Sequence, residues 1–97
     1  MVTATLNGTV VAASDNTVVV EGNHYFPIED VVGDVLQQND RQSRCFWKGD
    51  ASYFDVVVDG ESSAAEAWTY ADPLPKAETL KGRVAFWKGV EITDAAR

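Results

Sequence analysis

Dipeptides that close tight turns divide the chain into short stretches of strand-forming residues, and this spacing constrains the fold most. The turn signals are Asn7-Gly8, Gly49-Asp50, Asp59-Gly60 and Lys88-Gly89. Glycine and asparagine supply the positive φ that two-residue hairpin turns require. Between the turns, β-branched and aromatic residues are enriched over residues 9–13, 17–21, 44–48, 51–58, 67–70, 82–87 and 90–93. The pattern predicts a mainly β fold of about eight short antiparallel strands.

The order of these stretches predicts which strands pair. Residues 9–13 and 17–21 lie on either side of Ser14-Asp15-Asn16 and predict a small meander. Residues 44–48 and 51–58 predict a hairpin across Gly49-Asp50. Because strand side chains alternate between two faces, one face of residues 51–58 is expected in the core: Ser52, Phe54, Val56 and Val58.

The C-terminal third is predicted to hold the last strands. A small-residue segment, 61–65, precedes the strand 67–70, which Pro73 and Pro75 prevent from continuing. Residues 76–80 predict a helical turn, and residues 82–87 and 90–93 predict a final strand pair joined across Lys88-Gly89.

One amphipathic α-helix is predicted directly after Pro27. Glu29 and Asp30 would lie near its positively polarised start, and its end is expected near Asn39. Gly33 weakens this helix by about 1 kcal/mol relative to alanine. Apolar residues recur there at the spacing of one helical face: Ile28, Val31, Val32, Val35 and Leu36.

Length and cysteine content predict one domain, residues 1–97, that is stabilised by packing alone. A chain of 97 residues supports a single core. Cys45 is the only cysteine and His24 the only histidine, so neither an intramolecular disulfide nor a Cys/His zinc site is expected, and the sequence implies no metal or cofactor. No signal peptide and no apolar run of about 20 residues is visible, so we expect a cytoplasmic protein without a membrane span.

The charge balance argues against a nucleic-acid partner. Eight basic and fifteen acidic residues give a formal net charge of −7, and the acidic residues are spread along the chain. Proteins that bind nucleic acids use lysine and arginine to displace the counterions of the phosphates, and no basic stripe or basic helix face is visible here. The acidic surface is expected to keep a small domain soluble.

Residues 44–54 concentrate the side chains that favour a binding site. Lys48 follows an aromatic pair and precedes a glycine, so its ammonium could meet a carboxylate or phosphate, with Ser52 close in sequence. The alternative is a solvated surface lysine. Four aromatic residues could supply a stacking platform with polar groups at its edge, or could simply be core: Tyr25, Tyr53, Trp68 and Tyr70. These residues predict a pocket for a small planar or anionic metabolite.

Two other classes of function stay open. An enzyme could use Lys48 or Cys45 as nucleophile or acid/base group, with Tyr25 or Asp30 assisting. For Cys45 the alternative is a small buried hydrophobic residue, and for Asp30 a favourable charge at a helix start. A third interpretation is an interaction domain that forms a homodimer through a β edge or exposed aromatic residues.

Several short motifs together resemble the domain-of-unknown-function family 427 (DUF427). The resemblance covers about residues 10–92. Its densest marks are Tyr25-Phe26-Pro27 with Asp30, Cys45 with Lys48-Gly49, Ala51-Ser52-Tyr53, Asp59-Gly60, Trp68 with Tyr70 and Asp72-Pro73, and Val84-Ala85-Phe86. The resemblance implies two antiparallel sheets in a tent-like arrangement with a ligand space between them. Some relatives of that architecture carry zinc, but this chain lacks such ligands.

The same family is sometimes labelled nucleotidyltransferase-like, and the residues give that activity little support. Nucleotidyl transfer generally uses two close carboxylates to hold Mg²⁺. Asp55 and Asp59 would share a strand face but lie roughly 13 Å apart, well beyond the ~4 Å of a two-metal site. No phosphate-binding P-loop pattern is present either.

Overall fold

The computed structural model describes residues 1–94. In it the chain folds into antiparallel strands that form two sheets. Two short 3₁₀ segments, η1 (Ile28–Asp30) and η2 (Pro75–Leu80), accompany them. The nine strands of the described part are β1 (Val2–Leu6), β2 (Thr9–Ser14), β3 (Val18–Val20), β4 (Asn23–Pro27), β5 (Leu36–Cys45), β6 (Gly49–Val58), β7 (Glu61–Thr69), β8 (Arg83–Phe86) and β9 (Glu91–Asp94). The prediction of a mainly antiparallel β fold in two sheets is confirmed.

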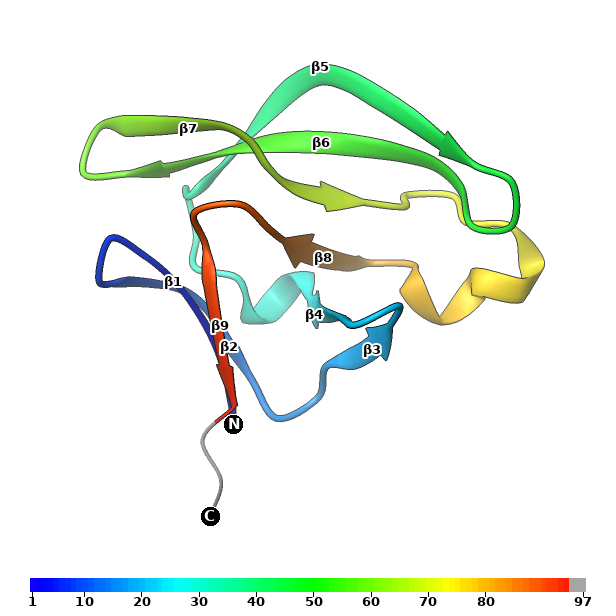
Figure 1. Cartoon of the computed structure of the whole chain (residues 1–97), viewed down its shortest axis with the longest axis horizontal. Helices are drawn as coiled ribbons and strands as arrows, with labels where there is room; N and C mark the ends of the chain where they lie inside the picture. The colour runs from blue at the N-terminus through cyan, green and yellow to red at the C-terminus, as the bar shows by residue number, and fades with distance from the viewer. Residues whose placement is uncertain (95–97) are drawn as a thin grey trace.

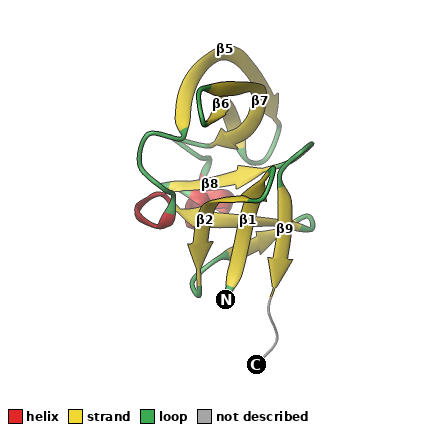
Figure 2. Cartoon of the chain, turned by 90° about the vertical axis from the view of Figure 1, so that its left-hand side faces the viewer, coloured by secondary structure: helices red, strands yellow, loops and turns green. Residues whose placement is uncertain are grey.

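The two sheets differ in size and direction. The smaller has the order β2-β1-β9, and the larger has the order β3-β4-β8-β7-β6-β5. Figure 1 shows the long strands β5, β6 and β7 along the top and the smaller sheet below their left-hand end. In Figure 2, β1, β2 and β9 run across the direction of β8. The sheets therefore enclose apolar side chains between them.

Three hairpins close with two-residue turns whose first residue is not glycine. Asn7-Gly8 joins β1 to β2 and Asp59-Gly60 joins β6 to β7, both as the turn chemistry predicts. Glu21-Gly22 joins β3 to β4 with the same pair of positive φ values, 53° and 80°. A left-handed conformation costs a non-glycine residue about 1–2 kcal/mol, so the position of Glu21 is maintained by its surroundings.

The predicted amphipathic helix over residues 28–39 is wrong. Only η1 is helical there, and residues 1–94 contain no α-helix. The Val32 N–H donates to the Val11 carbonyl, and the Val35 carbonyl accepts from the Val57 N–H, so this segment takes its backbone partners from strands. Asp34 has a φ of +69°, which interrupts any helix, and β5 begins at Leu36. Within residues 1–94 no helix is long and apolar enough to span a bilayer.

Two predicted strand pairs are also wrong, because their members belong to different sheets. β2 pairs with β1, whereas β3 pairs with β4, so residues 9–21 do not form a meander. β8 pairs with β4 and β7, whereas β9 pairs with β1. The four residues 87–90 lead from one sheet to the other. Strands such as β8 and β9 pair with strands far away in the sequence, and a local sequence pattern does not identify such partners.

Strand boundaries differ from the prediction around the β5–β6 hairpin. The turn between β5 and β6 consists of Phe46, Trp47 and Lys48, and Gly49 already belongs to β6 with a φ of +107°. The Leu74 N–H donates to the Lys48 carbonyl at 3.0 Å, which fixes the turn against the segment after β7. The small-residue segment 61–65, expected to precede the strand 67–70, is itself the first half of β7. Residues 75–80 form the expected helical turn, η2.

Buried side chains form two clusters on opposite sides of the larger sheet's central strands. The first lies between the sheets and includes Phe26, Val56 and Phe86, with Phe54 and Val58 packed against it, as predicted for that face of β6. The second comprises the other buried residues of these strands and of η2: Tyr25, Ala51, Tyr53, Ala65, Trp68, Tyr70, Ala77, Leu80 and Ala85. β6 thus buries side chains on both faces, and the second cluster contains all four aromatic residues proposed as a site.

Candidate functional site

A pocket of about 200 Å³ opens over the second cluster. Its lining comes from β4, β6, β7 and the segments that follow β5, β7 and β8. The lining residues are Asn23, Tyr25, Lys48, Tyr53, Trp68, Tyr70 and Trp87. Five of the eight residues proposed from the sequence are therefore brought together in one place.

Strand register explains why these side chains converge. Tyr53 of β6 lies directly opposite Trp68 of β7, and Tyr70 follows two residues later on the same face. Tyr25 of β4 reaches this face from the other side of β8. The turns of two hairpins, β5–β6 and β3–β4, then contact each other through Lys48 and Glu21, on the right-hand side of Figure 1.

Lys48 is a buried cation with one carboxylate partner. It is only 8% exposed. Its ammonium forms an ion pair with Glu21, whose side chain is 54% exposed. The same Nζ lies 5.3 Å from the centre of the Trp47 ring and 5.7 Å from the centre of the Tyr70 ring, so aromatic faces provide its remaining surroundings.

The ionisation of the pocket residues is set by burial and by this ion pair. Burial alone would lower the pKa of Lys48, but the hydrogen bond to Glu21 and the nearby Tyr70 outweigh it and raise that pKa above its ordinary value. Burial also raises the pKa of Tyr25 and of Tyr70. At neutral pH the pocket therefore presents the Lys48 ammonium and the neutral phenols of Tyr25 and Tyr70.

Trp68 is the central ring of the pocket. Its Nε1–H donates to the Tyr25 hydroxyl oxygen at 3.2 Å, and the two rings meet edge to face with their centres 6.1 Å apart. Trp87 packs against the other side at 5.6 Å. Because the Tyr25 oxygen accepts the indole proton, its own O–H proton is free to donate. The Tyr70 hydroxyl makes no hydrogen bond within residues 1–94. Two phenol groups can therefore serve a ligand.

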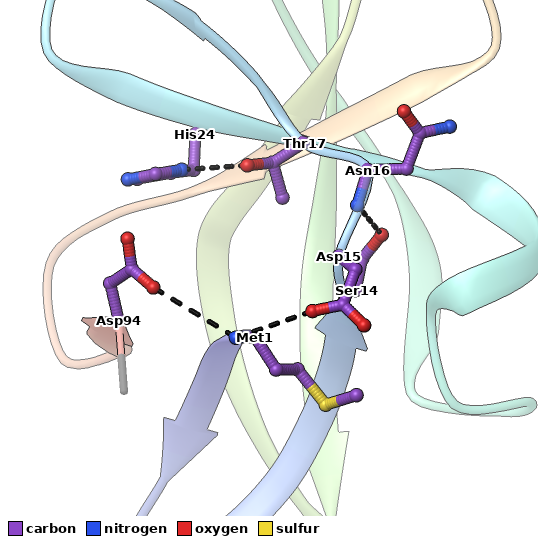
Figure 3. Close-up of polar contacts among 7 residues, drawn as sticks. All are labelled: Met1, Ser14, Asp15, Asn16, Thr17, His24 and Asp94. Atoms are coloured by element: carbon purple, nitrogen blue, oxygen red, sulfur yellow. Dashed lines mark hydrogen bonds and ion pairs between the residues drawn. The ribbon is translucent and has the colours of Figure 1, made fainter. Parts of the chain in front are cut away.

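The remaining sequence-proposed residues lie outside the pocket lining. Cys45, at the end of β5, is half-buried against the second cluster. Ser52 alternates with Tyr53 along β6 and so faces the opposite side of the strand. Asp30 lies in η1. His24 Nδ1 shares a hydrogen bond of 2.8 Å with the Thr17 hydroxyl, drawn as a dashed line in Figure 3, so this nitrogen is already engaged.

The carboxylates of the described residues do not form a metal centre. Within residues 1–94 no group of three or more His, Cys, Asp or Glu side chains is placed to hold a metal ion. The Asp55 carboxylate accepts from the Asn39 side chain at 2.7 Å and from the Ala65 N–H at 2.9 Å. Asp59 lies in an exposed turn. The Asp55 carboxylate is thus engaged by the two strands that flank β6.

Three site residues were missed by sequence reasoning. Trp87 directly follows a marker of the family resemblance, and Asn23 begins β4 just before Tyr25. Glu21 precedes a glycine in a tight turn, where glutamate is uncommon, and that was the available signal. Their role depends on contacts between hairpins, which a strand pattern does not reveal.

A family model described as domain of unknown function (DUF427) matches residues 1–96. This match confirms the resemblance drawn from the short motifs and spans every residue that lines the pocket. Comparison with curated proteins gives no match.

Proposed function

The chain belongs to the family described as domain of unknown function (DUF427), and we propose that it is a binding domain for a small planar metabolite that carries an anionic group. The observation that carries this proposal is the buried ammonium of Lys48, which faces a pocket lined by aromatic rings. A buried lysine needs a negative partner, because an unpaired buried charge is strongly destabilising. A carboxylate or phosphate of the ligand would serve as that partner.

Glu21 supports the anionic part of the proposal. Its carboxylate occupies the position at Lys48 that a ligand anion would take, and its side chain is half exposed on a two-residue turn. Glu21 can therefore move into solvent when a ligand anion takes its place on Lys48. In this proposal the ligand anion replaces Glu21 on Lys48. The anion must therefore bind the Lys48 ammonium more strongly than the Glu21 carboxylate does.

The volume and the rings support the planar part. Pockets for drug-sized ligands measure about 300–1,000 Å³, whereas this pocket measures about 200 Å³. It suits one ring with a short substituent better than a whole nucleotide. The Trp68 ring and the phenols of Tyr25 and Tyr70 offer stacking surface and two hydrogen-bond donors.

The enzyme interpretation receives less support from the same residues. A nucleophilic lysine needs a lowered pKa, whereas the pKa of Lys48 is raised, so this amine stays protonated. A catalytic Cys45 needs a base or a cation beside it. The Thr17 hydroxyl engages His24, and Cys45 lies outside the pocket lining. We therefore assign Lys48 to charge recognition.

Thermal unfolding with a ligand panel tests the proposal. The panel contains benzoate, phenyl phosphate, and nucleotides with and without Mg²⁺, and the proteins are wild type, Lys48→Met and the matched control Lys76→Met at an exposed lysine. A ligand at 100 times its dissociation constant adds about 2.7 kcal/mol, a shift on the order of 10 °C for a domain of this size. We expect a shift in wild type and control that is lost in Lys48→Met.

The outcomes separate the interpretations. An equal shift in wild type and Lys48→Met would place the ligand elsewhere and refute the role of Lys48. A nucleotide shift that requires Mg²⁺ would revive nucleotidyl transfer. Conversion of a ligand during the measurement, followed by product analysis, would favour the enzyme interpretation.

A second candidate function is self-association, which the exposure of Phe46 favours. This ring is 90% exposed at the tip of the β5–β6 hairpin. β5 is also an edge strand of the larger sheet, with backbone groups available to another strand. Light scattering across a concentration series tests it. A dimer that Phe46→Ser dissociates would support this candidate, and a monomer at all concentrations would reject it.

A further inference from the structure

Two further cations lie against the aromatic wall of the pocket. The guanidinium carbon of Arg41 is 4.8 Å from the centre of the Tyr53 ring and 5.7 Å from that of the Trp87 ring. The Lys88 Nζ is 5.0 Å from the centre of the Trp87 ring. Both rings line the pocket. Together with Lys48, three positive charges surround a pocket of about 200 Å³ in a chain of net charge −7.

These two cations have no anionic partner of their own. Neither Arg41 nor Lys88 forms an ion pair with a carboxylate of residues 1–94. By contrast, Arg44 on the same strand as Arg41 is paired with Asp50 at 2.8 Å. Because Arg41 and Lys88 have no paired carboxylate within residues 1–94 and lie against rings that line the pocket, they make the potential at its rim more positive.

The backbone holds Arg41 in place at an irregularity of β5. The pairing of β5 with β6 shifts register between Asn39 and Gln42, and Arg41 lies within that interval. Its N–H donates to the Asn39 side-chain oxygen at 2.8 Å, and the Asn39 amide nitrogen donates to Asp55 at 2.7 Å. A chain of hydrogen bonds from β6 thus fixes the position from which Arg41 reaches the rings.

Stacking on aromatic faces leaves the hydrogen-bonding edge of a guanidinium open. That edge binds a carboxylate or a phosphate through two parallel N–H donors. We propose that Arg41 forms a second anion subsite at the rim of the pocket, so that the preferred ligand is a planar ring with two anionic groups, one bound by Lys48 and one by Arg41. This inference rests on the proposed function, because it needs the Lys48 pocket to bind the first group.

A comparison of monoanionic and dianionic probes tests the subsite. The probes are benzoate and its three dicarboxylate analogues, phthalate, isophthalate and terephthalate, which differ in the spacing of the two charges. Affinities are measured by calorimetry and by tryptophan fluorescence at low salt. The variants are Arg41→Gln, Lys48→Met and the control Arg44→Gln, which removes an exposed arginine of the same strand.

We expect at least one dicarboxylate to bind wild type more tightly than benzoate does. Arg41→Gln should weaken that dicarboxylate about tenfold or more, the usual effect of a lost charge-assisted pair, and change benzoate less than about twofold. Lys48→Met should weaken both probes, and Arg44→Gln neither. Raising the salt concentration should reduce the advantage of the dicarboxylate.

Each alternative result decides a different point. If Lys48→Met weakens benzoate but Arg41→Gln leaves every dicarboxylate unchanged, the subsite is refuted and the proposed function stands. If Arg41→Gln weakens benzoate and dicarboxylates equally, Arg41 only maintains the ring wall and the subsite is refuted as well. If wild type binds none of the four probes, the subsite is refuted, and the proposed function fails as well if phenyl phosphate gives no thermal shift.

Discussion

Trp68 belongs both to the core and to the wall of the pocket. It is 8% exposed, bonds the Tyr25 hydroxyl through its indole nitrogen, and packs between the rings of Tyr25 and Trp87. A ring that contacts two others contributes more than its buried area alone, by about 0.5–1.5 kcal/mol for each aromatic pair. The shape of the pocket therefore depends on the stability of the second cluster.

Truncation of this ring should be costly. We expect Trp68→Ala to lower the free energy of unfolding by about 3–5 kcal/mol, because it removes a large buried side chain. Trp68→Phe keeps a ring and loses the indole donor, so it should cost less. Urea denaturation monitored by far-UV circular dichroism measures both. A loss below about 1 kcal/mol for the alanine variant would show that Trp68 is a solvated wall and not core.

The Lys48–Glu21 pair joins a buried partner to an exposed one, so its two halves should differ in a mutational test. Glu21→Gln leaves the buried ammonium without its countercharge, which should cost about 1–3 kcal/mol. Lys48→Met leaves Glu21 free to be solvated and places an apolar chain in a buried position, so its cost should be smaller.

Urea denaturation of these two variants at pH 7 decides the order. Equal losses would indicate that Lys48 becomes solvated when its partner is removed. The raised pKa of Lys48 also sets the pH dependence of this contribution. The pair stabilises the fold fully below the unfolded lysine pKa of about 10.4 and loses that effect only as the pH rises further. A change in the difference between wild type and Lys48→Met from pH 6 to pH 8 would contradict this assignment.

At the scale of elements, Asp55 lies where the pairing of β6 with both of its neighbouring strands, β5 and β7, changes register. The pairing with β5 shifts register between Asn39 and Gln42, and the pairing with β7 shifts between Phe54 and Val56. The Asp55 carboxylate accepts from Asn39 of β5 and from the N–H of Ala65 in β7. Ala65 itself has a φ of +55°. One side chain thus stabilises the irregular stretch of three adjacent strands.

Removal of Asp55 should be destabilising in a pH-dependent way. The Ala65 N–H and the Asn39 amide hold the pKa of Asp55 below its ordinary value. The ionised form therefore stabilises the fold above about pH 3.9, the unfolded value, and this contribution disappears as the pH falls through the folded-state pKa. Asp55→Asn keeps an acceptor but no charge, so the advantage of wild type over this variant should shrink as the pH falls from 6 to 3. Chemical denaturation over that range measures it, and a constant difference would refute the assignment.

At the scale of the whole molecule, the first cluster joins the two sheets while the second cluster carries the site. Phe26 of β4 is fully buried in the first cluster and meets Phe86 edge to face at 5.7 Å. The three tryptophans, by contrast, all lie in or against the second cluster or the pocket. Since strands β4, β6, β7 and β8 contribute to both clusters, we expect the two to unfold as one cooperative unit.

Phe26→Ala tests this coupling. The substitution should cost about 3–5 kcal/mol and lower the thermal midpoint by more than about 10 °C. Tryptophan fluorescence, which reports the second cluster, should shift by the same amount as circular dichroism, which reports both sheets. Two separate transitions would show that the site region unfolds independently of the first cluster.

The sequence by itself determined the features that depend on local chemistry. Asn7-Gly8 and Asp59-Gly60 close hairpins because those residues tolerate positive φ wherever they occur. Most of the strand-forming stretches became strands, and Trp68 near the end of β7 and Tyr70 just after it, two residues apart, face the same pocket. Lys48, Trp47 and Tyr53 could be grouped from the sequence because they are close neighbours along the chain.

The tertiary structure decided every feature that depends on a distant partner. Residues 28–39 have helical spacing, yet hydrogen bonds to Val11 and Val57 draw them into strand pairing. β9 leaves its neighbour β8 and pairs with β1 at the other end of the chain. Glu21 reaches Lys48 only because two hairpin turns meet. Local propensities amount to tenths of a kcal/mol per residue, so a few long-range contacts are enough to override them.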